Sequence, residues 1–178
     1  TTTTDYCGNV VYENGVQKLL LTDEGYVTLS DNKYHYYLKD HQGNNRVVIN
    51  QSGTVEETNH YYPFGGVFAS AGNVQPYKYN GKEYDGKKGL NWYDYGARMY
   101  DAALGRFMTV DPLAEKYYPM SPYGYCLNNP IKFIDADGRL PRIYIERKGF
   151  GHAFVTVGNG DNTIVYTYGR YGELGKDK

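Results

Sequence analysis

The stretch YHYYLKDHQGNNRVVINQSGTVEETNHYYPFGG, residues 34–66, contains short runs rich in Tyr, Val and Ile that are separated by Gly, Asn and Asp. Gly, Asn and Asp favour tight turns, and Tyr, Val and Ile fit the pleated surface of a sheet. Val47 and Ile49 alternate with their neighbours, as side chains do along a strand. Helical periodicity is absent, so the stretch predicts strands joined by tight turns.

The same pattern extends over the first 90 residues, where each run ends in Gly, Asn or Asp. That spacing is typical of an all-β meander with short connections. Residues 24–37 and 52–62 also resemble each other: each has a Gly, a Val two residues later, a polar stretch and a Tyr pair. They indicate either a degenerate repeat in a stacked β architecture or two unrelated hairpins in a sandwich.

The composition is dominated by tyrosine. The chain has 178 residues, of which 40% are hydrophobic and 22 are Tyr. This length suffices for one ordinary domain core, or for one domain with a short appendage. The core must therefore contain many Tyr rings, and each buried hydroxyl needs a hydrogen-bond partner.

Charge and cysteine content exclude several classes of function. Lys and Arg number 19 against 20 Asp and Glu, and the basic residues are scattered, which argues against nucleic-acid or anionic-membrane binding. No apolar run approaches the roughly 18 residues that span a bilayer. Cys7 and Cys126 lie far apart and, with four His, form no metal-ligand spacing. We therefore expect no cofactor, no metal and no disulfide.

The ends of the chain are typical of an excerpt from a larger protein. The sequence begins TTTTDYCGN without Met or a signal peptide, and it ends GELGKDK. Localisation cannot be read from these ends.

From Leu90 onward the pattern changes. Residues 90–101 predict one strand, and residues 106–112 predict a second that Pro112 stops. Residues 113–133 contain three prolines and predict an ordered loop with at most one helical turn, around residues 123–127. Beyond a boundary near residue 139 or 140, residues 153–157 and 163–168 predict a hairpin joined by GNGDN.

The segment YNGKEYDGKKGLNWYDYGARMYDAALGRFMTVDPLAEKYYPMSPYGYCLNNPIKFIDADGR, residues 79–139, strongly resembles the Rhs repeat-associated core domain. This domain closes the Rhs and YD-repeat proteins, which include bacterial polymorphic toxins and toxin-complex C components. Residues 34–66 resemble one to two of the repeats that precede it, so the resemblance covers roughly residues 34–139.

The resemblance implies an all-β fold in which YD/Rhs repeats wind into a spiral sheet that forms a hollow shell. Residues 1–89 would be such repeats, and residues 90–140 the core, a Pro/Tyr-rich plug that curls inward. Residues 141–178 would begin a variable effector, or toxin, carried inside. The implied partners are this effector, the upstream repeats, a secretion apparatus and an immunity protein. The implied location is secreted or on the bacterial cell surface.

The resemblance also implies a self-cleaving aspartic protease. Asp111 and Asp135 match the acidic residues of the family, Arg98 matches its essential arginine, and cleavage would fall between Arg139 and Leu140. Two neighbouring carboxylates suit peptide hydrolysis because one stays an acid while the other activates water. An arginine can orient a carboxylate or polarise the scissile carbonyl.

Taken without the family, the same residues have simpler interpretations. Asp-Pro and Asp-x-Asp-Gly commonly start turns, because Asp caps its own backbone. Arg98 could pair with Asp94 or Asp101 at the surface. The chain also has Ala136 where the family commonly has proline, which would loosen the turn that presents the scissile bond.

Two other functions remain open at this stage. A Tyr-rich β surface could bind glycans or a cell-surface protein without catalysis, and Tyr side chains exposed in a row would favour this. Alternatively, residues 141–178 begin a hydrolase, with His152 as its reactive group. No nucleophile with a supporting context follows His152, and a lone His is commonly an ordinary residue at a strand end.

Overall fold

The computed structural model describes residues 2–116, 119–139, 141–143, 153–157 and 164–168. The chain divides into two compact units: Thr1–Tyr62 with Val67–Gly81, and Pro63–Gly66 with Lys82–Lys178. Strands dominate both, and the helical elements of the described residues are 3₁₀ turns of three residues each. The predicted all-β fold is confirmed.

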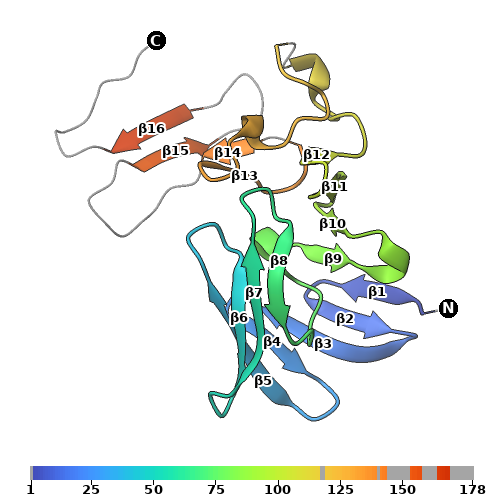
Figure 1. Cartoon of the computed structure of the whole chain (residues 1–178). Coiled ribbons are helices and arrows are strands. Elements are labelled where there is room, and N and C mark those ends of the chain that lie inside the picture. Colours follow the sequence, from blue (N-terminus) through green and yellow to red (C-terminus); the bar gives the residue numbers. More distant parts are fainter. Residues whose placement is uncertain (1, 117–118, 140, 144–152, 158–163, 169–178) are drawn as a thin grey trace. The chain divides into compact units, whose positions relative to one another are not determined.

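The first unit is one antiparallel meander in which each strand pairs with the next along the chain (Figure 1). Turn residues close the hairpins: Asn14 and Gly15 both have positive φ, 51° and 78°, as the tightest hairpin turns require. The strands are β1 (Thr4–Cys7), β2 (Val10–Glu13), β3 (Val16–Thr22), β4 (Gly25–Thr28), β5 (Lys33–Lys39), β6 (Asn45–Asn50), β7 (Val55–Tyr61) and β8 (Val67–Ala71).

The two similar sequence segments do not form equivalent structures. Residues 24–37 form the β4–β5 hairpin, whereas residues 52–62 form a turn and the single strand β7. Asn32 has a φ of 54° and turns the chain in the first segment. The second segment has Glu56, Glu57 and Thr58 in the middle, which do not favour a turn, so the strand continues.

One face of this sheet carries a buried polar cluster beside Val48, Tyr26 and Tyr61. The carboxylate of Glu57, with a fully buried side chain, accepts hydrogen bonds from Lys78 Nζ at 2.5 Å and Gln75 Nε2 at 3.1 Å. Its other oxygen accepts the backbone N–H of Val74 at 2.8 Å. Burial lowers the pKa of Lys78, and the bond to Glu57 opposes that shift. The cluster fixes the returning segment 74–78 to the sheet.

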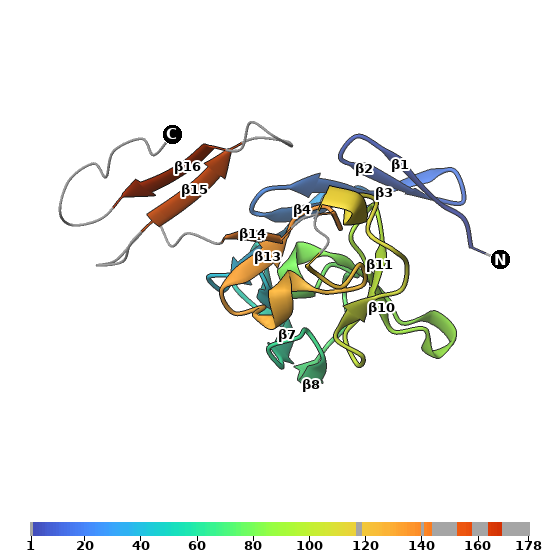
Figure 2. The same cartoon turned by 90° about the horizontal axis from the view of Figure 1, so that it is seen from above.

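The second unit contains three small antiparallel groups of strands. The first has the order β12-β11-β10-β9. The second pairs β13 with β14, and the third pairs β15 with β16 (Figure 2). The last pair confirms the predicted hairpin in the tail. The strands are β9 (Glu83–Asp85), β10 (Trp92–Asp94), β11 (Met99–Asp101), β12 (Arg106–Phe107), β13 (Phe133–Asp135), β14 (Pro141–Ile143), β15 (Ala153–Val157) and β16 (Ile164–Tyr168).

Three local predictions for this unit are wrong. Residues 90–101 form the β10–β11 hairpin instead of one strand, because Gly96, at φ 86°, turns the chain and Tyr95 N bonds to Arg98 O. The predicted strand 106–112 keeps only β12. The described part of the loop 113–133 has two helical turns, at Ala114–Lys116 and Cys126–Asn128, where at most one was expected. All three residues of the second turn have left-handed φ values, 47°, 52° and 56°.

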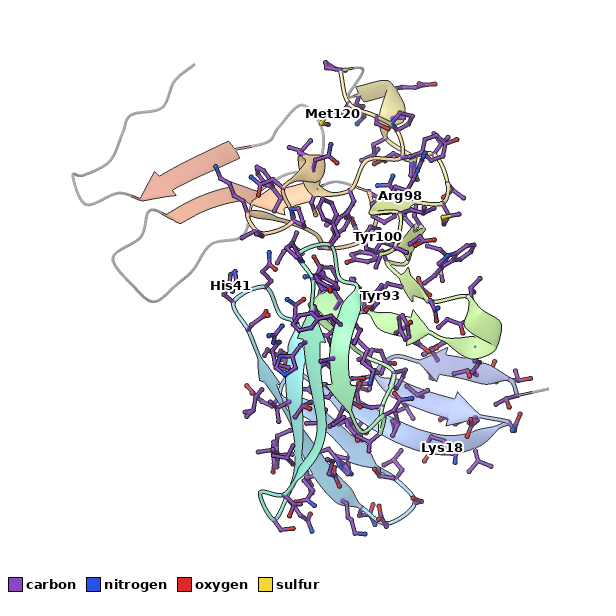
Figure 3. The ribbon with its side chains drawn as sticks, in the orientation of Figure 1. Lys18, His41, Tyr93, Arg98, Tyr100 and Met120 are labelled. Atoms are coloured by element: carbon purple, nitrogen blue, oxygen red, sulfur yellow. The ribbon has the colours of Figure 1, made fainter. Side chains whose placement is uncertain are left out.

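Aromatic rings form the core of this unit. Tyr84, Tyr93, Tyr100 and Phe107 occupy paired positions across the sheet β9–β12. Figure 3 shows Tyr93 and Tyr100 on neighbouring strands. Their hydroxyls donate to Gly65 O at 2.9 Å and to Phe64 O at 2.8 Å, respectively. The hydroxyls of Tyr95 and Tyr125 share a hydrogen bond of 3.0 Å. Four buried Tyr side chains thus have the hydroxyl partners that the composition demands.

Both cysteines are free thiols: Cys7 is exposed and Cys126 is buried. Burial raises the pKa of Cys126 to about 12. Within the described ranges, no three His, Cys, Asp or Glu side chains gather in a way that could hold a metal ion. None of the helices in the described part of the chain is long and apolar enough to cross a membrane.

Candidate active site

Arg98 is the centre of the candidate site. It ends the tight turn between β10 and β11, and its side chain is 1% exposed. The guanidinium lies 3.7 Å from the centroid of the Phe107 ring, so it is held against the aromatic core. Nη1 donates to Pro122 O at 3.1 Å, and Nε donates to Gly138 O at 2.5 Å. The alternative of a surface ion pair with Asp94 or Asp101 is wrong, because the side chain is buried and pairs elsewhere.

Asp111 follows β12 and precedes Pro112. Its Oδ1 accepts the backbone N–H of Leu113 at 2.7 Å, which starts the turn η3 (Ala114–Lys116). Its Oδ2 accepts Arg98 Nη2 at 2.8 Å. One oxygen of the carboxylate therefore caps the turn, and the other forms the ion pair with Arg98. Its side chain remains 16% exposed.

Asp135 ends β13 and is 1% exposed. Its Oδ1 accepts three backbone N–H groups, from Asp137 at 3.3 Å, Gly138 at 2.8 Å and Arg139 at 3.2 Å. Its Oδ2 lies 3.5 Å from Arg98 Nη2. Burial raises the pKa of Asp135, while the three N–H groups and Arg98 oppose the shift.

The two carboxylates predicted from the sequence thus meet at one guanidinium nitrogen. Asp111 and Asp135 each direct Oδ2 to Arg98 Nη2. The arrangement is asymmetric: Asp135 is enclosed, and Asp111 retains contact with solvent. This asymmetry favours Asp135 as the acid, because burial raises its pKa and a carboxyl with a raised pKa keeps its proton to higher pH.

A cavity of about 250 Å³ opens beside Asp111. Arg139 lines the same cavity, so the residue before the predicted cleavage point and one candidate acid share it. The remaining walls are mostly small or apolar: Ala114, Pro119, Met120, Ser121, Pro122, Gly124, Leu127 and Asn128.

The described strands on either side of the predicted scissile bond pair with each other. β13 pairs antiparallel with β14, and Asp135 is opposite Pro141 in the register. Leu140, and therefore the Arg139–Leu140 bond, lies outside the described residues, as does His152. The described neighbour of that bond is the peptide group between Gly138 and Arg139. Arg98 contacts its carbonyl oxygen, and Asp135 accepts its N–H.

Sequence reasoning missed three parts of the site. The Pro122 carbonyl binds both Arg98 and the backbone N–H of Asp111. The left-handed turn that contains Leu127 and Asn128 lines the cavity. Lys82 donates from Nζ to Ala136 O at 2.6 Å. The contact of the Pro122 carbonyl could not be predicted from the sequence, because every residue has a backbone carbonyl. Lys82 could have been considered, because it lies in GKEYD near the start of the segment that resembles the core domain.

Comparison with known proteins gives sequence relatives in two groups. Salivary gland surface protein 1 of Aedes aegypti is 40% identical over 114 residues, which cover 62% of this chain and 3% of the relative. The toxin subunits YenC2 and YenC1 of Yersinia entomophaga are 35% and 32% identical over 55% and 57% of this chain. Part of the chain is therefore similar in sequence to toxin-complex subunits. It spans only 10% and 11% of the two Yersinia proteins.

Solved structures show the same fold. The Tc holotoxin pore of Photorhabdus luminescens with a TccC3 mutation has a TM-score of 0.65, is 23% identical, and matches over 83% of this chain and 8% of its own. The TcdB2–TccC3 crystal structure has a TM-score of 0.63 and is 22% identical over 77% of this chain and 8% of its own. No protein-family model matches the chain. The β fold is therefore that of part of these toxin-complex chains.

Proposed function

We propose that this chain is the C-terminal part of an Rhs-type toxin-complex subunit whose core segment cuts the chain at Arg139–Leu140. The observation that carries the proposal is the meeting of Asp111 and Asp135 at Arg98 Nη2. The segment beyond Leu140 would be the start of the released effector. The relatives' names and the solved toxin complexes support the toxin-complex part of the proposal.

The contacts suggest a division of labour in the hydrolysis. Asp111, which borders the cavity, takes a proton from water as the water oxygen attacks the scissile carbonyl carbon. Arg98 stabilises the negative charge that develops on the carbonyl oxygen. Asp135 donates its proton to the leaving amide nitrogen as the C–N bond breaks. All three N–H donors of the turn bind Oδ1 of Asp135, so Oδ2 can carry this proton.

Encapsulation is the second part of the proposal. The repeats of the first unit would belong to a shell, and the aromatic core of the second unit would form its plug, with upstream repeats and the effector as partners. Secretion, or display on a bacterial surface, and binding to a secretion apparatus and an immunity protein belong to the same proposal. Because the chain spans only 10% and 11% of the two Yersinia proteins, other segments would form the rest of the shell.

Intact mass spectrometry of the freshly purified full chain tests self-cleavage. We expect two fragments, one ending at Arg139 and one beginning at Leu140. Because β14 pairs with β13, the fragments should stay together until the protein is denatured, so the masses are measured in denaturant. A cut one bond earlier would begin the second fragment with Arg139. A chain that stays at full mass after prolonged incubation would contradict self-cleavage.

A specific observation also favours the non-catalytic alternative for the first unit. On β5, Tyr34, Tyr36 and Leu38 are 52%, 41% and 50% exposed and point to the same face, whereas Tyr37 points to the other. Flat exposed rings suit sugar faces or a protein partner. A glycan array probed with wild type and with Tyr34→Ala tests this idea. Equal signals from both proteins, or no signal from either, would remove glycan binding through this row.

A further inference from the structure

The turn 136–139 is fastened through both its N–H and its carbonyl groups. The N–H groups of the last three residues bind Asp135 Oδ1, a contact made within the turn itself. The carbonyls bind groups from elsewhere in the second unit. Gly138 O accepts Arg98 Nε, Asp137 O accepts the N–H of Ala97 at 3.1 Å, and Ala136 O accepts Lys82 Nζ at 2.6 Å.

The turn is also pressed against the β10–β11 connection. Gly138 has a φ of 74°, and a Cβ there would lie 3.1 Å from Arg98 N and 3.1 Å from the Cβ of Tyr95. Only glycine combines this φ with so close an approach at low cost. A small shift of the turn would therefore break the contact between Gly138 O and Arg98.

Lys82 holds the first residue of this turn through its carbonyl group. A proline at residue 136 would fix φ, but Ala136 does not. The hydrogen bond from Lys82 to the Ala136 carbonyl supplies a restraint that the ring would otherwise give. Lys82 joins the turn to the start of β9, a separation of 54 residues.

The surroundings of Lys82 suit this function. Its Nζ lies 5.1 Å from the centroid of the Tyr95 ring, within the range of a cation–π contact. Burial lowers the pKa of Lys82, while the carboxylates of Asp135, Asp137 and Asp94 oppose the shift. A hydrogen bond from an ammonium group to a carbonyl oxygen is stronger than a neutral one, because one partner is charged.

We propose that Lys82 is a positioning residue of the self-cleaving site: its ammonium group fixes the Ala136 carbonyl and thereby keeps the Asp135–Arg139 turn against Arg98. The inference rests on the proposed function for its effect on cleavage. The tethering of the turn is a property of the fold and can be measured without cleavage.

The test compares Lys82→Met, Lys82→Gln and Lys82→Arg in the full chain, with the exposed Lys116→Met as the matched control. Cleavage is followed by intact mass over time. Hydrogen exchange of the Gly138 and Arg139 amides is measured in an Asp111→Asn background, which keeps the chain in one piece. Two uncharged variants are used so that the conclusion does not depend on the folding of either one.

The expected result is cleavage about tenfold slower in Lys82→Met and Lys82→Gln, and amide exchange in the turn about tenfold faster. Lys82→Arg, which keeps a cationic donor, should restore both to within about threefold of wild type. Lys116→Met should change neither. Rescue by Arg separates positioning by a charged donor from loss of packing.

Unchanged cleavage and unchanged exchange in the uncharged variants would overturn the inference. If the wild type is never cut, the proposed function fails, and hydrogen exchange alone decides about Lys82. Faster exchange of the Gly138 and Arg139 amides in Lys82→Met would then still show that Lys82 restrains the turn. Equal exchange with and without Lys82→Met would show that it does not.

Discussion

Asn in place of Asp111 or Asp135 is expected to leave the full-length chain as the main species, with self-cleavage slowed about 10²- to 10⁴-fold. Asp111→Asn removes the group proposed to accept the proton of water, and Asp135→Asn removes the proposed proton donor. Both amides still offer an oxygen to the backbone N–H groups that the carboxylates now bind. The fold should therefore survive, and the rate is measured by intact mass over time.

Asp137→Asn is the matched control, because Asp137 is an exposed carboxylate in the same turn. Its cleavage rate should stay within about threefold of wild type, since general acid–base catalysis needs a group at the reacting atoms. Equal rates for wild type and either Asp111→Asn or Asp135→Asn would exclude that aspartate from the chemistry.

The pH dependence supplies a second readout for Asp135. Burial raises its pKa in the folded chain, so the proton-donor form persists above the usual range of Asp and is lost as pH rises through the raised value. The cleavage rate should therefore fall as pH rises through the raised pKa of Asp135. Because the folded state holds this proton more tightly than the unfolded state, Asp135 makes the free energy of unfolding decrease as pH rises from about 3.9 to the raised pKa. Asp135→Asn should abolish that decrease.

The largest effect on stability is expected at Glu57. Glu57→Ala should lower the free energy of unfolding by about 3–5 kcal/mol, because Lys78 would stay buried without a carboxylate. The N–H of Val74 and the amide of Gln75 would also lose their acceptor. Hydrogen exchange of the amides in β6 and β7 reports this change for the first unit directly.

Glu13→Ala is the control for this substitution, because the Glu13–Lys18 pair at 3.2 Å is largely exposed. Its effect should stay below about 1 kcal/mol. The double variant Glu57→Leu with Lys78→Met should recover much of the loss, since a buried ion pair is replaced by apolar side chains and no charge is left alone. A loss below about 1 kcal/mol for Glu57→Ala would mean that the cluster contributes little.

Local sequence predicted most of the first unit because its contacts are between neighbouring strands. Alternation of Val47 and Ile49 with their neighbours predicted the strand β6, although the structure buries Val48 on the opposite face. Turn residues such as Asn14 and Asn32 marked the hairpin ends. The similarity of residues 24–37 to residues 52–62 was misleading, since only the first segment has a residue that turns the chain in its middle. In the second unit, alternation predicted one strand over residues 90–101. Gly96 instead turns the chain and divides this segment into β10 and β11.

For the candidate site, the sequence by itself determined an all-β chain rich in turns, a tyrosine core whose hydroxyls need partners, and, through the resemblance, Asp111, Asp135 and Arg98. Only the tertiary structure decided that both carboxylates reach one nitrogen of Arg98, that Asp135 is the buried member, and that Lys82 fastens the turn at Ala136. These contacts join residues 13, 37 and 54 positions apart. Side-chain alternation and turn propensity act over a few residues, so they specify strands and hairpins, whereas packing of the whole unit specifies which distant groups meet.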